Sequence, residues 1–263
     1  MDHQSEAVVI RAVCVEFLGE HLGSQLAALA RPGFGLSPAG ESRPAAGRSR
    51  LGGPPLLDPG TPWPHDDDLP LSLFAVLDTD ELTPWLGDEL PVRPGLLNFF
   101  GIDHLQACRV VPADPTRAAP VRPPDDDAFA VVPLHAEPCL SLPDAWWGAT
   151  LEDFIEGFGL DPGPDLTSIC DPSEQVTELF AGDFPGEHYP GSGAVDQAFG
   201  WPPSVQPGDP LPDLRGEYTH LLRLSSNLGE WEFAEGGSLH FLIPRKALRD
   251  GDFSQAVVAS DDG

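Results

Sequence analysis

Apolar residues occur along the chain in short runs, and their spacing predicts a fold that is rich in β-strands and has few helices. Between residues 5 and 30 the apolar positions lie three or four apart, which is the spacing of one helix face. This helix should begin near Ser5 and end at Arg31-Pro32-Gly33. Its buried face should consist of Val8, Ala12, Val15, Leu18, Leu22, Leu26 and Leu29.

The segment 31–70 has no sustained period and is predicted as loop, whereas short apolar runs after it predict strands. These strands are expected at 70–78, 94–102, 107–113, 128–134, 217–227, 237–244 and 254–260. Helical segments are expected at 78–86, 148–160, 172–182 and 244–253. Strand 70–78 is apolar at almost every position, so it should be buried on both faces. The pattern predicts an α+β fold of mixed or antiparallel sheets, with an N-terminal helix and long ordered loops rich in glycine and proline.

Two parts of the chain resemble each other. Strand 70–78 is followed by the motif G-x-L-x-F at Gly95–Phe99, and strand 217–227 is followed by the same motif at Gly237–Phe241. A diverged internal duplication covering 70–102 and 217–243 would explain this similarity. Two unrelated amphipathic hairpins would explain it equally well.

The stretch RLGGPPLLDPGTPWPHDDDLP, residues 50–70, permits three interpretations: a disordered linker, a metal site or an ordered element. Consecutive carboxylates cannot all face one ion, and the stretch lacks the pattern of a calcium-binding loop. Prolines reduce the conformational freedom of the unfolded chain, so an ordered element is favoured. Trp63 should be largely buried against the sheet, Asp66–Asp68 should form a solvated turn, and no metal is expected at His65.

The net charge bears directly on which partners the protein can bind. The chain carries 42 acidic and 14 basic residues, a net charge of −28. Such a surface repels phosphate backbones, so nucleic-acid binding is not expected. Composition and solubility alone would explain the charge; a surface that docks a basic protein partner is the alternative with a functional meaning.

The four cysteines are far apart and are predicted to be buried thiols. The N-terminus lacks the features of a signal peptide, and no apolar run approaches the roughly 20 residues needed to span a bilayer. A cytoplasmic location and no membrane association are therefore expected.

Several kinds of catalytic or cofactor site are absent from the sequence. It contains no phosphate-binding G-x-x-x-x-G-K-[ST], no G-x-S-x-G and no H-E-x-x-H, and no cofactor or metal is expected. The remaining candidate set consists of His188, Trp201, Gln206, His220, Trp231 and His240. Alternation predicts that His220 shares the face of Leu222 and Leu224, whereas His240 faces away from Leu239 and Phe241. These residues would form a cleft for a small polar ligand or a polar network that fixes a long loop to the sheet.

Ordered blocks of the sequence resemble the YwqG-like bacterial proteins, a family of unknown function. They include LGGPPLLDPGTPWP (51–64), PLSLFAVLDTDEL (70–82), LPVRPGLLNFFGID (90–103), HYPGSGAVDQAFGWPPSVQ (188–206), THLLRLSSNLGEWEFAEGGSLHFLIP (219–244) and GDFSQAVV (251–258). The chain departs from the family pattern at Val76 and Arg223, which stand where the family has glutamine. The resemblance implies one compact β-rich domain over 51–263, preceded by a helix and connecting loop over 1–50.

These observations favour a bacterial, non-enzymatic protein-interaction domain with an acidic surface. The resemblance extends weakly to proteins found beside toxins, which would suit an immunity-type role with a basic partner. The alternative is a small-ligand-binding or hydrolytic domain whose pocket lies near His188, Trp201 and Gln206.

Overall fold

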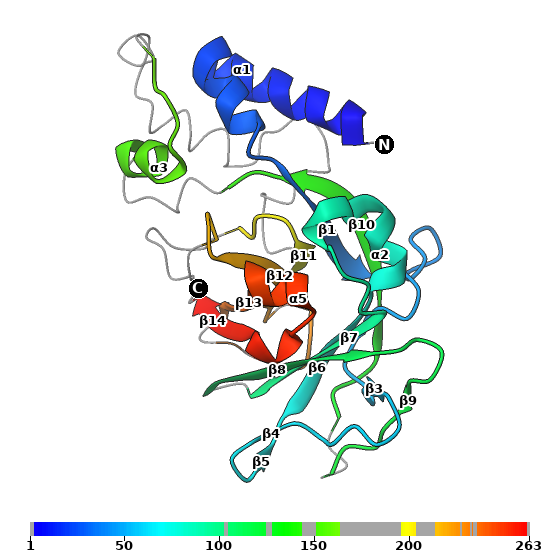
Figure 1. Cartoon of the computed structure of the whole chain (residues 1–263). Helices are drawn as coiled ribbons and strands as arrows, with labels where there is room; N and C mark the ends of the chain where they lie inside the picture. Colours follow the sequence, from blue (N-terminus) through cyan, green and yellow to red (C-terminus); the bar gives the residue numbers. More distant parts are fainter. Residues whose placement is uncertain are drawn as a thin grey trace.

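One long antiparallel sheet organises the molecule (Figure 1). The computed structural model describes residues 3–102, 105–124, 128–143, 151–163, 196–203, 214–226, 228–231, 233 and 236–261. Ten strands form the sheet in the order β14-β13-β12-β11-β1-β10-β2-β6-β7-β8. Their bounds are β1 Arg31–Pro38, β2 Arg50–Leu51, β6 Ser72–Asp78, β7 Leu96–Ile102, β8 Leu105–Ala113, β10 Val132–Ser141, β11 Asp196–Phe199, β12 Tyr218–Ser225, β13 Ser238–Pro244 and β14 Val257–Asp261. The predicted α+β class is confirmed.

Shorter elements surround this sheet. The helices are α1 His3–Ala27, α2 Thr79–Leu86, α3 Leu151–Phe158 and α5 Arg245–Asp250, with the 3-10 turns η1 Gly87–Glu89 and η4 Phe253–Gln255. Two small strand pairs lie outside the main sheet: β3 Leu56–Leu57 with β9 Ala119–Pro120, and β4 His65–Asp66 with β5 Leu69–Pro70. In the part of the chain that the structure describes, no helix has the length and apolar character required to cross a bilayer.

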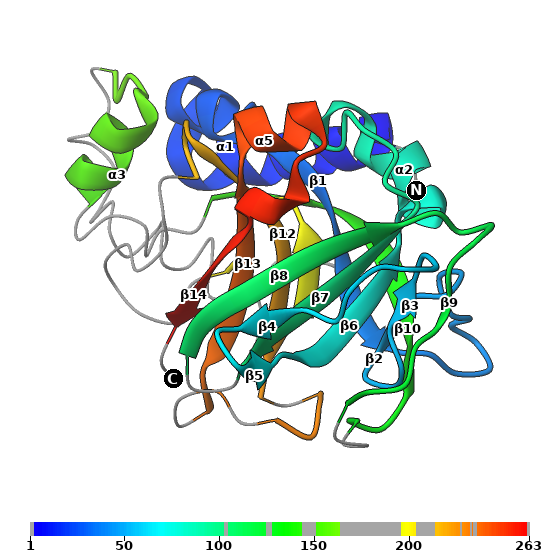
Figure 2. The same cartoon turned by 60° about the horizontal axis from the view of Figure 1, so that its bottom comes forward.

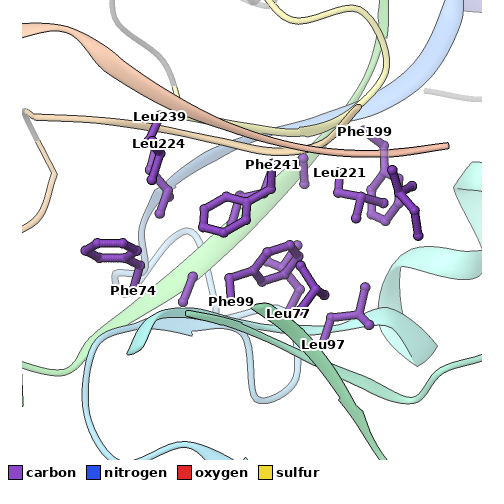
Figure 3. Packing of buried hydrophobic residues seen from close by; sticks show 14 of the residues in the cluster. Phe74, Leu77, Leu97, Phe99, Phe199, Leu221, Leu224, Leu239 and Phe241 are labelled. Atoms are coloured by element: carbon purple, nitrogen blue, oxygen red, sulfur yellow. The ribbon is translucent and has the colours of Figure 1, made fainter. Parts of the chain in front are cut away.

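The sheet curls until its two edge strands, β8 and β14, lie side by side, so that it is nearly a closed barrel (Figure 2). Apolar side chains from both halves of the sheet meet inside it (Figure 3). Phe99 on β7 meets Phe241 on β13 edge to face, with ring centroids 5.2 Å apart. Strand β6 is buried on both faces, as predicted: Phe74 and Leu77 point into the barrel, and Leu73 and Val76 lie under an outer layer.

The strand order is symmetrical about the β1–β10 pair. We call β10, β2, β6, β7 and β8 the first half-sheet, and β1, β11, β12, β13 and β14 the second half-sheet. Ser37 pairs with His135 at the midpoint, and the register is equivalent on both sides of that pair. The segments 70–102 and 217–243, for which a duplication and two unrelated hairpins are equally open, occupy matching places, with β6–β7 in the first half-sheet and β12–β13 in the second.

The N-terminal helix is present, but its buried face differs from the predicted one in its first half. Val8 is 64% exposed, whereas Ile10 and Val13 are buried. Gly19 has a non-helical backbone (φ 75°, ψ 168°), so the segment is two helices joined at a kink, and one helical period cannot describe both. From Leu18 onward the predicted face is correct, with Leu18, Leu22 and Leu26 packed in a cluster that also contains Phe154 and Ile155 of α3.

Two strands in the centre of the sheet correct the sequence prediction. β1 lies in the predicted loop 31–70 and pairs with β10 on one side and β11 on the other. β11 lies in the predicted loop region 183–217. The expected domain boundary between residues 50 and 51 stays a prediction. β1, which precedes that boundary in the sequence, is a strand of the main sheet. The predicted helix 172–182 lies outside the described residues.

The glycine- and proline-rich stretch before β6 is ordered. Trp63 is half-buried rather than largely buried; its Nε1 donates to the Leu71 carbonyl at 3.0 Å, and its ring meets Phe100 edge to face. Three of the predicted buried thiols, Cys14, Cys108 and Cys139, are buried and free. Cys170 lies outside the described residues.

Candidate functional site

Trp201 joins the N-terminal segment to the sheet. Its side chain is 3% exposed, and its Nε1 donates to the Leu29 carbonyl at 2.6 Å. The Arg31 guanidinium lies 3.4 Å from the centre of its ring, and Phe158 contacts the ring edge to face. These contacts attach the chain between α1 and β1 to the end of β11.

Trp231 lies inside the barrel. Its ring packs against Phe74 and Phe129, and its Nε1 donates to the Ser225 carbonyl at 3.1 Å. His220 lies on the outer face of β12, so the structure does not bring Trp231 and His220 together. His188 and Gln206, the other two predicted site residues, lie outside the described residues.

A β-bulge decides where His220 points. The pairing of β12 with β13 shifts between His220 and Leu222, so Leu221 and Leu222 both face the interior. The prediction that His220 shares the face of Leu222 and Leu224 is therefore wrong. His240 faces away from the interior as predicted, and the bulge brings the two imidazoles together with ring centroids 5.8 Å apart.

The outer face of β11, β12 and β13 carries a buried row of polar side chains. Gln197 pairs with Arg223, and Arg223 pairs with His240, so these three residues share one face of neighbouring strands. Gln197 and His240 are 0% exposed, and Arg223 is 2% exposed. Below we refer to Gln197, His220, Arg223 and His240 as the polar face.

Two members of the polar face support a tight turn at the end of β11. Phe199 and Gly200 both have left-handed backbones, with φ of 59° and 68°. The Gln197 Nε2 donates to the carbonyls of Phe199 (2.7 Å) and Trp201 (2.8 Å). The His220 Nδ1 lies 3.2 Å from the Phe199 carbonyl oxygen. Ser141 accepts the backbone N–H of Trp201 through its Oγ at 2.7 Å.

After these bonds are formed, two buried acceptor atoms have no hydrogen-bond donor. A carbonyl oxygen can only accept, so the contact with Phe199 requires the proton of neutral His220 to sit on Nδ1. The His220 Nε2 is then an acceptor, and it has no hydrogen-bond partner. The Gln197 Oε1 also has none. The amide cannot turn over to change this, because its Nε2 donates to two carbonyls. A buried polar atom without a partner costs about 1–3 kcal/mol.

Burial fixes the charge state of this face. Desolvation lowers the pKa of His220 to about 3, with Arg223 adding to the effect, and it lowers the pKa of His240 well below its ordinary value. Both imidazoles are neutral at physiological pH, whereas Arg223 is charged. With both imidazoles neutral, these residues can form hydrogen bonds to a bound molecule. Among the described residues, no group of three or more histidine, cysteine or acidic side chains is placed to hold a metal ion.

Gln197 and Arg223 were absent from the predicted site. Arg223 interrupts the apolar run LLRL, and a charged residue inside an otherwise apolar strand is the sequence signal that points to it. Gln197 lies in the four-residue strand DQAF, where neither length nor periodicity gives a signal.

A comparison with protein families agrees with the broad resemblance found in the sequence. The family model described as "Domain of unknown function (DUF1963)" matches residues 49–261. None of the curated proteins that were compared with the chain matches it. The match covers the main sheet from β2 to β14, and the chain belongs to the DUF1963 family of domains of unknown function.

Proposed function

We propose that the protein is a non-enzymatic binding protein whose acidic surface docks a basic protein partner. The observation that carries this proposal is how the chain uses its few cations. With 42 acidic and 14 basic residues, the cations can neutralise at most a third of the acids. Many of the described cations are buried or bound to acids.

Four cations illustrate this use. Arg117 bridges Asp58 at 2.9 Å and Asp114 at 3.0 Å. Lys246 binds Asp250 at 2.5 Å. Arg31 is stacked on Trp201, and Arg223 is buried on the outer face of the sheet. These cations neutralise particular acids, and the excess of 28 acidic residues leaves the rest of the surface negative.

The turn between β4 and β5 is a prominent part of that surface. Asp66, Asp67 and Asp68 follow one another there, and none of them has a cationic partner among the described contacts. Neighbouring carboxylates repel one another, so a partner that brings lysine or arginine to this turn would relieve the repulsion. The same field disfavours nucleic acid and would accelerate association with a basic protein.

The family resemblance suggests one form of this function, an immunity-type role in which the acidic protein binds and blocks a basic partner. A bacterial cytoplasmic location would suit that role. The finer assignment to the YwqG-like proteins rests on the sequence blocks and is part of the same proposal.

Capture from a native lysate tests the proposal. The immobilised protein should retain a basic protein at low ionic strength and release it at high ionic strength, because salt screens charges separated by more than a Debye length of about 10 Å at 0.1 M. An unrelated protein of equal size and net charge serves as the control bait. Equal recovery on both baits, or no basic protein on either, would refute the proposal.

A matched pair of variants locates the contact. Asp66, Asp67 and Asp68 are replaced by asparagine in one variant, and the same charge is removed in the other at Asp80, Glu81 and Asp88 on and after α2. If the β4–β5 turn is part of the docking surface, the first variant loses more of the partner than the second. Equal losses would show that only the total charge matters.

A further inference from the structure

The two half-sheets match residue by residue, which supplies an internal control for the polar face. In the first half-sheet β2 pairs Arg50 with Val76; in the second, β11 pairs Gln197 with Arg223. The bulge lies between Leu73 and Ala75 in β6 and between His220 and Leu222 in β12. These pairs place Leu73 in correspondence with His220, and Val76 with Arg223.

The turns after β2 and β11 match as well. Gly52 and Gly53 have φ of 57° and 72°, and their counterparts Phe199 and Gly200 have φ of 59° and 68°. The sequence following these turns is also similar, with PPLLDPGTP at 54–62 and PPSVQPGDP at 202–210. Strand order, register, bulge position and backbone conformation agree, which two unrelated hairpins would not be expected to reproduce.

The inner faces of the two half-sheets carry the same kind of residue. Leu77, Leu97 and Phe99 in the first half-sheet correspond to Leu224, Leu239 and Phe241 in the second. All six lie in the central apolar cluster (Figure 3). At these positions the fold itself requires apolar side chains, because they form the core.

The outer faces differ in kind. In the first half-sheet Leu73, Val76 and Phe100 pack under Leu57 and Trp63, and Asn98 is satisfied by both backbone groups of Leu56 at 2.8 Å. The positions that correspond to Leu73, Val76 and Asn98 hold His220, Arg223 and His240. At the positions of His220 and Arg223 the first half-sheet has Leu73 and Val76, so the fold does not dictate the polar side chains there. Gln197 corresponds to another polar residue, Arg50, whose Nη1 is also buried without a partner.

We propose that the chain is a duplicated unit, residues 31–113 and 132–261, in which β1 and β10 each lie in the half-sheet formed by the other copy. The second copy holds a small uncharged ligand on the polar face through hydrogen bonds that the ligand donates. The His220 Nε2 and the Gln197 Oε1 are the acceptors, and both are fully buried without a partner. The charge of Arg223 on the same face disfavours a cationic ligand. Hydroxyl or amide N–H groups on a neutral molecule satisfy both acceptors.

A pair of matched probes tests this site. Acetamide carries two N–H donors, and N,N-dimethylacetamide has the same carbonyl without a donor. In protein labelled with ¹⁵N, acetamide should shift the His220 Nε2 resonance saturably, whereas N,N-dimethylacetamide should not. N,N-dimethylacetamide keeps the carbonyl and the amide plane but carries methyl groups in place of both N–H donors, so an effect of the amide plane or the solvent would appear with both probes.

Two variants complete the test. His220→Leu copies the residue of the first half-sheet, and Gln197→Leu removes the second acceptor. Each variant should weaken acetamide binding at least tenfold. Binding is measured from the ¹⁵N resonance of His240 in His220→Leu and from that of His220 in Gln197→Leu. The basic-partner function does not involve this face, so capture of a basic protein should be unchanged in both variants. The site is refuted if neither probe moves the His220 resonance, if both move it equally, or if the variants bind acetamide as the wild type does.

Discussion

The correspondence between Leu73 and His220 allows a reciprocal exchange whose two halves have opposite expected effects on stability. Leu73→His introduces an imidazole into the apolar layer under Leu57 and Trp63. His220→Leu introduces an isobutyl group where a buried acceptor now lacks a partner. Backbone, bulge position and strand neighbours are equivalent at the two sites, so the surrounding side chains decide the outcome.

The magnitudes follow from the contacts. Leu73 is 5% exposed, and losing its burial costs about 1.5–3 kcal/mol. Burying an imidazole there without a partner adds about 1–3 kcal/mol, so Leu73→His should destabilise the protein by roughly 2.5–6 kcal/mol. His220→Leu loses the bond from Nδ1, about 0.5–1.5 kcal/mol, but removes an unsatisfied acceptor worth about 1–3 kcal/mol. The Phe199 carbonyl keeps its bond from Gln197, so the net change should lie between a destabilisation of about 0.5 kcal/mol and a stabilisation of about 2.5 kcal/mol.

Equilibrium unfolding in urea, followed by circular dichroism, measures both changes. The slope of the unfolding free energy against urea should match the wild type for both variants, which verifies that the same surface is exposed on unfolding. If His220→Leu destabilises the protein as much as Leu73→His does, the polar face is a structural network and the internal-control argument is refuted.

Three further predictions concern groups whose surroundings are well defined. Gly200→Ala and Gly251→Ala both place alanine at a left-handed φ, which costs about 1–2 kcal/mol. Only at Gly200 would the new Cβ meet another atom, Ser141 Oγ at 2.3 Å, so Gly200→Ala should lower the unfolding free energy more. Equal losses would contradict the described turn. Burial raises the pKa of Asp196 from 3.8 to about 6. The contribution of this carboxyl to the unfolding free energy is therefore complete below pH 3.8 and is lost as the pH rises through 6, by about 3 kcal/mol in total. Asp196→Asn should flatten that part of the pH–stability profile, and an unchanged profile would show that the carboxyl is not buried. Burial raises the pKa of Cys14 to about 12 and of Cys108 to about 11. In a Cys170→Ser variant, a thiol reagent should therefore modify cysteine only after denaturant is added. Rapid labelling of the native protein would contradict the burial of these thiols.

The sequence predicts those elements whose pattern is local. Strands β6, β7, β12 and β13 combine apolar composition with turn residues at both ends, so they are found within a few residues of their true bounds. β1 was missed because its sequence, RPGFGLSP, contains two prolines and two glycines and has low strand propensity. Pairing with β10 and β11 on both sides overrides that propensity, and such long-range pairing leaves no local signal.

The candidate site shows the same limit. Alternation placed His240 correctly because β13 is regular, whereas the bulge in β12 reversed the prediction for His220. A bulge adds one residue to one strand, and its position depends on the partner strand. The orphaned acceptors depend on which donors the turn at Phe199 and Gly200 uses, so they are visible only in three dimensions.

The central claim is that the second half-sheet holds a ligand at positions where the first half-sheet has Leu73 and Val76. A crystal structure at a resolution that distinguishes water from an organic molecule tests this claim most directly. Protein purified without denaturation should show density for a small molecule that donates to both the His220 Nε2 and the Gln197 Oε1. A protein donor within hydrogen-bond distance of both atoms, or water alone beside them, would contradict the claim.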